Sequence, residues 1–320
     1  MNFLVTGGAG FIGSHLCTFL LEEKSNHVIA IDNFTLGKKD NVSHLLNFNN
    51  FELIEGDVNN FIFLETIFSN FKFDRVYHLA ANSDISISHK NPSVDYKNTF
   101  QTTWSILEMI RIYQIQQFVF ASTSAIFGEA HESIDENYGP IQPISHYGAG
   151  KLASEAFISS FSYNYNIETL IVRFPNVVGG RSTHGIIYDF LKKLSSNPDE
   201  LIVLGNGKQE KSYLHVSDLI KAIQQAWSVR KNKFEVFNIG GIDSITVQRI
   251  AEIVLEETKG KQKIRYTGGD RGWIGDVPKF NYEIKKILNT GWLPSLNSEQ
   301  SIRRTVIELL NEQLKFKHDN

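Results

Sequence analysis

The chain has 320 residues, of which 42% are hydrophobic and 21% are charged, and its formal net charge is −3. This length allows one large domain or two smaller ones around a sizeable core. The small net charge, without a long basic stretch, gives no electrostatic reason to expect nucleic acid or a membrane surface as a partner. No run of about eighteen apolar residues predicts a membrane span. The single cysteine, Cys17, rules out an intrachain disulfide and predicts a reducing, cytoplasmic location.

Short apolar runs alternate with helical patterns in the first half of the chain. The runs contain Val, Ile, Leu and Phe without clean alternation, which is typical of parallel strands buried on both faces. Repeated strand–helix units predict an α/β fold with a doubly wound parallel sheet, the Rossmann-type architecture. The predicted strands cover residues 3–6, 28–32, 51–55, 75–79, 118–121 and 169–172, and helices are predicted at 11–23 and 93–113.

This rhythm weakens after about Arg173. Glycine pairs and polar turns become frequent, although helices are still predicted at 186–194, 217–227, 246–257 and 298–314. We therefore expect two parts. Residues 1–173 would form a Rossmann domain that carries the cofactor-binding and catalytic residues, and residues 174–320 would form mainly a smaller substrate-binding lobe.

A glycine-rich segment, Thr6 to Gly13, follows the first predicted strand and opens the first helix. Its glycines allow a tight turn, a close approach of backbone N–H groups to a pyrophosphate, and a helix N-terminus that faces the anion. Asp32 ends the second predicted strand, where a carboxylate accepts a hydrogen bond from a ribose 2′-hydroxyl and repels a 2′-phosphate. The segment therefore predicts NAD, not NADP. Gly56-Asp57-Val58, after the third strand, is either the adenine edge of this site or an ordinary turn.

A phenol and an ammonium group lie one helical turn apart at Tyr147 and Lys151, on the same helix face. Oxidation of a hydroxyl needs a base for the O–H proton while hydride leaves the carbon. Burial would raise the pKa of a tyrosine, whereas positive charge from Lys151 and an oxidised nicotinamide would lower it. Ser122-Thr123-Ser124 ends a buried strand, where α/β sheets place their ligands. Each of these patterns, taken alone, also fits a structural role.

Together these motifs resemble the extended short-chain dehydrogenases/reductases, in the branch of NAD-dependent sugar-nucleotide epimerases and dehydratases. The resemblance covers nearly the whole chain and preserves the order of the motifs. Further matching segments are His78-Leu79-Ala80-Ala81, Asn91-Pro92, Asn98, Arg173 to Gly179, Gly205 to Gln209 and Phe237 to Gly240.

The resemblance implies a role for each matching residue. Thr123, Tyr147 and Lys151 would form the catalytic triad, and Lys151 would also hold the nicotinamide ribose. The cofactor NAD would contact Gly7, Gly10, Phe11, Ile12, Gly13, Asp32, Asn33, Asp57, Val58, Leu79, Ala80, Ala81, Asn98, Ser122, Tyr147 and Lys151. The substrate, a UDP-, GDP- or dTDP-linked sugar, would contact Ser83, Asp84, Thr123, Asn176, Gly205, Gln209, Lys211 and Arg271.

The chain departs from this family pattern at two informative places. Family dehydratases carry Asp-Glu directly after the catalytic threonine, and family decarboxylases carry Glu at the second of these positions, whereas this chain has Ser124-Ala125. The resemblance therefore implies chemistry confined to C4 of the sugar, without loss of water or carbon dioxide. Lys211 replaces a phosphate-binding arginine of the family, and a lysine binds phosphate as a point charge without the bidentate fork.

Two reactions fit this site. A C4 epimerase would oxidise the sugar to a transient 4-keto intermediate and return hydride to the other face, which needs no external oxidant. The alternative is a net C4 dehydrogenase that releases the 4-keto sugar. A catalytically idle NAD-binding regulator is opposed by the intact triad, and a steroid or flavonoid substrate is opposed by Asn176 and Lys211.

Metal ligation and self-association are two further questions that the sequence addresses. His146 and His215 have no partners at metal-ligand spacing, so we expect no metal site. The resemblance implies a homo-oligomer, at least a dimer, that pairs through the helix after Pro92 and the helix that carries Tyr147.

The carboxylate of Asp32 predicts which of the two nicotinamide cofactors binds more tightly. Purified protein should bind NAD(H) more tightly than NADP(H), because the carboxylate repels the 2′-phosphate, and Asp32→Ala should reduce this preference. Titration calorimetry with both cofactors measures the difference. Equal or tighter binding of NADP by the unsubstituted protein would rule the prediction out.

Overall fold

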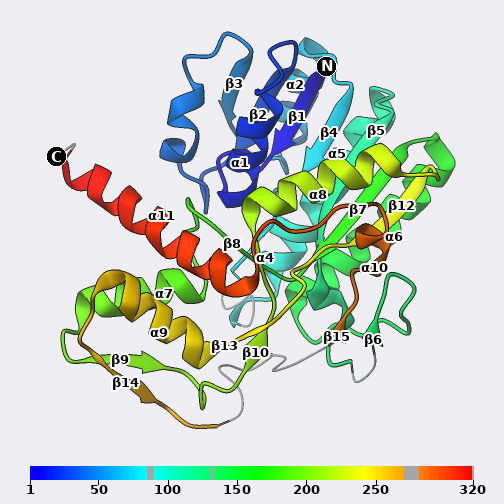
Figure 1. The fold of residues 1–320 in the computed structure, drawn as a ribbon. Coiled ribbons are helices and arrows are strands. Elements are labelled where there is room, and N and C mark those ends of the chain that lie inside the picture. Colours follow the sequence, from blue (N-terminus) through cyan, green and yellow to red (C-terminus); the bar gives the residue numbers. More distant parts are fainter. Residues whose placement is uncertain (85–89, 131–132, 270–280, 319–320) are drawn as a thin grey trace. The chain divides into compact units, whose positions relative to one another are not determined.

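The computed structural model describes residues 1–84, 90–130, 133–269 and 281–318 (Figure 1). The chain forms two compact units. Unit 1 consists of Met1–Gly128, Glu136–Phe174 and Ile223–Asn238, and unit 2 consists of Glu129–Asp135, Pro175–Ala222 and Ile239–Asn320.

Unit 1 is built on a seven-stranded parallel sheet with the strand order β12-β7-β5-β4-β1-β2-β3. The strands are β1 (Asn2–Thr6), β2 (His27–Asp32), β3 (Phe51–Glu55), β4 (Arg75–His78), β5 (Gln117–Thr123), β7 (Glu168–Phe174) and β12 (Phe234–Asn238). The chain moves outward from β1 to β2 and β3 and then continues on the other side of β1 at β4, so the order reverses between β1 and β4. Doubly wound sheets bind ligands at the carboxyl ends of their strands beside such a reversal. The predicted fold class is confirmed.

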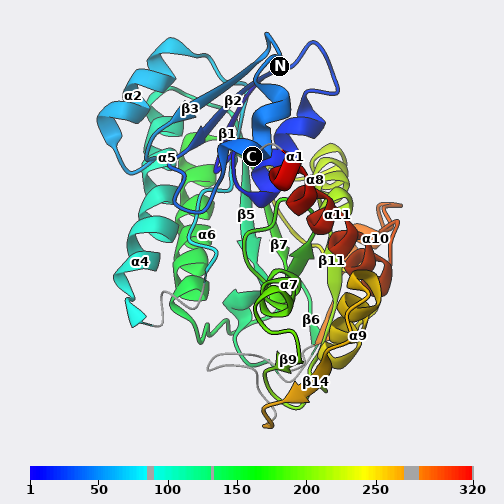
Figure 2. The same ribbon diagram turned by 90° about the vertical axis from the view of Figure 1, so that its left-hand side faces the viewer.

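Helices cover both faces of the sheet (Figure 2). On one face lie α2 (Phe61–Asn70), α5 (Thr102–Ile112) and α6 (His146–Tyr165). On the other face lie α1 (Phe11–Leu20) and the last part of α8 (Val216–Val229), where the ring of Trp227 stacks 3.8 Å from the guanidinium of Arg75.

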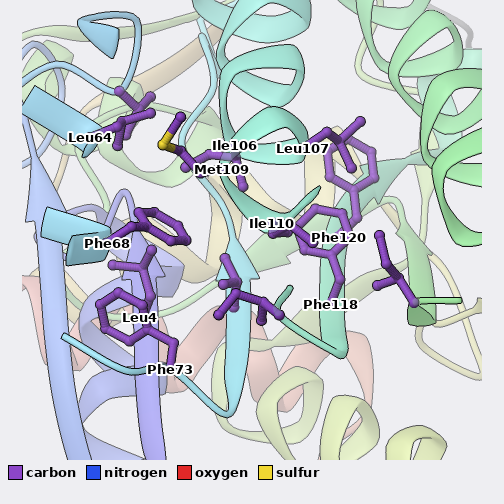
Figure 3. Close-up of a cluster of buried hydrophobic side chains, with 14 of the residues drawn as sticks. Leu4, Leu64, Phe68, Phe73, Ile106, Leu107, Met109, Ile110, Phe118 and Phe120 are labelled. Carbon is purple, nitrogen blue, oxygen red and sulfur yellow. The ribbon is translucent and has the colours of Figure 1, made fainter. Parts of the chain in front are cut away.

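The main core of unit 1 fills the space between the sheet and α2, α5 and α6 (Figure 3). Leu4, Phe118 and Phe120 point into it from the strands, and Leu64 and Ile110 meet them from the helices. These side chains come from apolar strands and from the apolar faces of the helices. This core fixes the sheet against α6, the helix that carries Tyr147 and Lys151.

The predicted strands are present with shifts of one or two residues at their ends, and the structure adds β12, which was not predicted. β12 pairs in parallel with β7, from Phe234 beside Thr169 to Asn238 beside Arg173. The helix predicted at 93–113 is interrupted: α4 (Ser93–Asp95) leads into a π-helical turn, η2 (Tyr96–Gln101), before α5 begins. Turns of this kind are frequent at functional sites because they insert one extra residue into a helix.

Unit 2 has a core of its own, formed by α7 (Ile186–Ser196), α9 (Val247–Thr258) and α11 (Ser298–His318) around Leu201 and Val203. Its strands form short pairs. These are β8 (Asn176–Val178) with β11 (Tyr213–His215), β9 (Glu200–Val203) with β14 (Lys263–Tyr266), β10 (Glu210–Lys211) with β13 (Ile245–Thr246), and β6 (Ser133–Ile134) with β15 (Asn281–Tyr282). α10 (Lys285–Leu288) completes the unit. None of the helices in the described part of the chain is long and apolar enough to cross a membrane.

Candidate active site

The glycine-rich segment forms a tight loop between β1 and α1. Gly7 has a φ of +71°, and a Cβ at this position would lie 2.9 Å from the backbone nitrogen of Ala80. A Cβ at Gly13 would lie only 2.1 Å from the carbonyl oxygen of Gly7. The N-cap residue of α1, Gly10, makes no side-chain cap. The N–H groups of a first helical turn have no partner within the helix and suit a bound anion. These positions need glycine, and the loop has the form that a dinucleotide pyrophosphate fits.

Asp32 lies at the adjacent end of β2. It is buried, and its carboxylate accepts hydrogen bonds from the backbone nitrogens of Ala9 at 3.0 Å and Phe34 at 2.9 Å. Burial raises the pKa of this carboxyl, while the backbone hydrogen bonds act in the opposite direction. The carboxylate is therefore anchored to the phosphate loop, as a ribose-binding acid would be.

The other predicted cofactor residues of unit 1 follow neighbouring strands at this same end of the sheet. Gly56 donates its N–H to the carbonyl of Asp32 at 3.0 Å, which places Asp57 and Val58 beside β2. Leu79 donates its N–H to the carbonyl of Thr6 at 3.1 Å, which places the half-buried Ala80 and Ala81 beside the loop. Phe11 and Ile12 begin α1 and are half-buried, Asn33 is exposed, and the carbonyl of Asn98 accepts from Asn82.

Tyr147 and Lys151 stand on the first turns of α6, which begins after Ser145. The Ser145 hydroxyl accepts a hydrogen bond from the N–H of Gly148 at 3.0 Å and caps the helix. The ammonium nitrogen of Lys151 lies 5.9 Å from the centre of the Tyr147 ring and donates to the carbonyl of Ala121 at 2.7 Å. The lysine side chain is thus held between α6 and the end of β5.

The electrostatics of this pair are governed by burial. Burial lowers the pKa of Lys151 to about 7, while the negative charges of Glu155 and Asp95 act in the opposite direction. Burial also raises the pKa of Tyr147 above its usual range, Asp95 raises it further, and a hydrogen bond with Thr123 lowers it. A phenolate at Tyr147 therefore needs added positive charge, which a charged Lys151 supplies.

Thr123 and Ser122 end β5 beside this pair, as predicted. The Thr123 hydroxyl accepts from the N–H of Ala125 at 3.1 Å and starts the short 3-10 helix η3 (Ser124–Phe127). A Cβ at Gly148 would lie 2.4 Å from the carbonyl oxygen of Ala125, so Ala125 packs directly against the turn that carries Tyr147. Ala125, whose side chain is a methyl group, therefore adjoins the turn of α6 that carries Tyr147.

A buried ion pair behind Lys151 escaped the sequence-based prediction. Arg173 at the end of β7 contacts Glu155 on α6 with Nη2 to Oε2 at 2.6 Å, and both side chains are 7% exposed. Ser122 also donates its hydroxyl to Glu155. Glu155 follows Lys151 by one helical turn, and Arg173 faces Ser122 across the β5–β7 register. The pairing could be found only from the strand register, because the three residues are distant in sequence.

A second acid that the sequence reading missed is Asp95, the last residue of α4. It is 1% exposed and influences both Tyr147 and Lys151. Asn82, which precedes the predicted substrate residues Ser83 and Asp84, donates its side-chain amide to Asp95 at 3.1 Å. Ser83 is exposed and Asp84 is half-buried in the same segment.

The remaining predicted substrate residues belong to unit 2. Asn176 on β8 donates its side-chain amide to the carbonyl of Ser212 at 3.2 Å. Gly205 has a φ of +82°, and a Cβ there would lie 1.9 Å from the amide nitrogen of the buried Gln209. Lys211 is half-buried on β10, and Arg271 lies outside the described residues. The structure thus brings Gly205 and Gln209 together.

A metal site needs several ligating side chains close together in the described part of the chain. The His, Cys, Asp and Glu side chains there form no group of three or more that could hold a metal ion.

Comparison with known proteins gives a consistent assignment. The model of the family described as GDP-mannose 4,6 dehydratase matches residues 4–305. A crystal structure of a UDP-galactose 4-epimerase is 34% identical with a TM-score of 0.85, and the match covers 98% of this chain and 100% of that one.

Two structures of complexes are similar over the same extent. The UDP-glucose 4-epimerase of Thermotoga maritima with UDP-glucose is 30% identical, with a TM-score of 0.87 and coverage of 98% and 100%. The UDP-glucuronic acid 4-epimerase of Bacillus cereus with UDP-glucuronic acid and NAD is 27% identical, with a TM-score of 0.86 and coverage of 98% and 100%. The resemblance drawn from the motifs is confirmed: the chain belongs to the GDP-mannose 4,6-dehydratase family of NAD-dependent sugar-nucleotide epimerases and dehydratases, within the extended short-chain dehydrogenases/reductases.

Proposed function

We propose that this chain is an NAD-dependent C4 epimerase of a UDP-linked sugar that works through a transient 4-keto intermediate. One observation carries the proposal: Thr123, Tyr147 and Lys151 converge at the end of β5, and the adjoining Ala125 offers no carboxylate. The similar proteins named as UDP-sugar 4-epimerases support both the reaction and the uridine nucleotide. A net C4 dehydrogenase remains the second candidate, because it would use the same three residues.

The residues that would hold NAD are those of the loop Gly7 to Gly13, with Asp32 at the ribose and Lys151 near the nicotinamide. In this place NAD would supply the hydride acceptor for oxidation at C4 and the hydride donor for its reversal. Tyr147 would take the proton of the C4 hydroxyl, and Thr123 would donate a hydrogen bond to the same oxygen. A charged Lys151 would stabilise the phenolate by its nearby positive charge. Asn176, Gly205, Gln209 and Lys211 would bind the nucleotide part.

Tyr147→Phe should abolish turnover while NAD still binds, because the phenol is the proton acceptor and the phosphate loop provides most cofactor contacts. Tyr163→Phe is the matched control, since Tyr163 lies on the same helix and is 87% exposed. Initial rates and NAD titrations are compared for the two variants. A Tyr147→Phe protein with more than about a tenth of the original rate would contradict the role, because general base catalysis contributes roughly 10²–10⁴-fold.

The reaction itself is tested by product analysis. Incubation with NAD and UDP-glucose, UDP-galactose or UDP-glucuronic acid should give the C4 epimer without net NADH, as followed by NMR and by absorbance. A 4-keto sugar with an equal amount of NADH would establish the dehydrogenase instead. A 4-keto-6-deoxy sugar or a pentose would show that the site performs elimination or decarboxylation, against the proposal.

A homo-oligomer, at least a dimer, is the second part of the proposal. An aromatic surface on η2, α5 and α6 supports it, with Tyr96, Trp104, Phe157 and Tyr165 all at least 40% exposed. Trp104 and Phe157 contact each other edge-to-face, with ring centres 5.3 Å apart. Exposed aromatic clusters of this kind are typical of protein interfaces.

Light scattering at micromolar concentration should therefore give at least twice the mass of the chain. Phe157→Glu should reduce the mass to that of a monomer, since it places a charge in the aromatic surface, whereas Ile62→Glu on the exposed side of α2 should not. A monomer mass for the unsubstituted protein would disprove the oligomer.

A further inference from the structure

Asp95 is a buried acid for which the proposed mechanism has no use. Its side chain is 1% exposed at the junction of α4 and the π-helical turn η2. One carboxylate oxygen, Oδ1, accepts from the amide of Asn82 at 3.1 Å and from the hydroxyl of Thr99 at 2.8 Å. The other, Oδ2, is buried and has no hydrogen-bond partner among the residues that the structure describes. Burial of a half-satisfied carboxylate is costly, which indicates a functional reason for its position.

The π-helical turn η2 and Asp95 pack closely against α6, the helix that carries Tyr147 and Lys151. A Cβ at Gly150 would lie 3.2 Å from the methyl group of Thr99 and 3.4 Å from the carbonyl oxygen of Asp95. Gly150 stands between Tyr147 and Lys151 on α6, so a glycine at this position lets the turn approach the pair. The negative charge of Asp95 favours the protonated forms of both Tyr147 and Lys151 and so raises both pKa values.

The other charged groups around this pair are already engaged. Glu155 on α6 is bound by Arg173 of β7 through two guanidinium nitrogens. His78 on β4 is fully buried between Thr6 and Thr103, and burial together with Lys151 keeps its pKa well below the usual value, so it is neutral. Asp95 has no arginine or lysine in an ion pair with it among the described residues, and Lys151 is the cation on which its charge acts.

We propose that Asp95 is a positioning residue of the catalytic centre, whose carboxylate is the counter-charge that holds Lys151 in its ammonium form beside Tyr147. This inference rests on the proposed function, because it concerns the proton acceptor of that reaction. The buried ammonium donates to a neutral carbonyl, that of Ala121, and desolvation favours its loss of a proton. With the ammonium lost, a phenolate at Tyr147 has no positive charge from the chain to stabilise it.

The direction in which the pH–rate profile should shift follows from the charges of the three groups. The active form of the Tyr147–Lys151 pair is a phenolate beside an ammonium, one proton fewer than in the fully protonated pair. The reaction rate therefore rises with pH as the pair loses its first proton, and it falls at higher pH as the ammonium loses the second. A negative charge close to the pair makes both losses harder. Removal of that charge should therefore move both limbs of the pH–rate profile to lower pH, by about one unit for a charge at close range. A residue that served only to pack the helices would change the height of the profile and leave its position unchanged.

The experiment compares pH profiles of kcat for the NAD-loaded full chain, with the product that the unsubstituted protein forms. Asp95→Asn, which preserves shape and removes charge, should shift both limbs to lower pH. Asp95→Glu, which retains the charge, should keep the limbs within about 0.3 units of the original even at reduced kcat. Glu65→Gln on the exposed face of α2 is the control for net charge and should change neither limb.

Thermal denaturation and NAD titration verify that each variant is folded. If Asp95→Asn does not fold, Asp95→Ser provides a second neutral variant, whose hydroxyl can still accept from Thr99. A neutral variant with the original limbs and a lower maximum would overturn the inference and leave Asp95 a structural residue. Failure of the proposed function is recognised separately, because the unsubstituted protein would then form no C4 epimer from any UDP-sugar.

Discussion

The arrangement of the site depends on one buried ammonium group, that of Lys151. A positive charge that has left water must be stabilised by nearby dipoles or negative charges, or it gives up its proton. Here the ammonium donates a hydrogen bond to the carbonyl of Ala121, and two acids from different elements act on it, Glu155 on α6 and Asp95 at the end of α4. The same charge would favour a phenolate at Tyr147, because burial alone works against that form. β5, α6 and the segment that leads into η2 each place a carbonyl or carboxylate group where it can stabilise this single charge.

The sheet topology determines where this framework meets the cofactor loop. Because the strand order reverses between β1 and β4, the loop after β1 and the segment after β4 diverge to opposite faces, and Gly7 touches Ala80 at the point of divergence. β5 lies next to β4, so its terminal residues Ser122 and Thr123 lie at the same end of the sheet. Motifs that are far apart in the sequence are thereby brought to one end of the sheet in unit 1.

Local patterns in the sequence were sufficient to predict much of this architecture. Glycine spacing predicted the phosphate loop, and the four-residue spacing of Tyr147 and Lys151 predicted a shared helix face, because both depend on nearby residues alone. Strand β12 was missed because it follows the segment Pro175–Ala222 of unit 2, beyond the expected boundary at residue 173. Glu155 and Asp95 were missed because their partners, Arg173 and Asn82, meet them only through strand register and helix packing. The roles of the predicted cofactor and substrate residues remain predictions.

The late position of β12 in the chain also affects how unit 1 can be synthesised. β7 ends at Phe174, but the strand that covers its open edge begins at Phe234, after the chain has passed through unit 2. Until that strand leaves the ribosome, β7 presents unpaired N–H and C=O groups on an apolar strand, a state that is prone to pairing with other chains. The seven-stranded sheet therefore cannot be completed during synthesis before the segment Pro175–Ala222 of unit 2 has been made. A nascent chain that stops between these strands would carry Tyr147 and Lys151 on a helix packed against a sheet with an exposed edge.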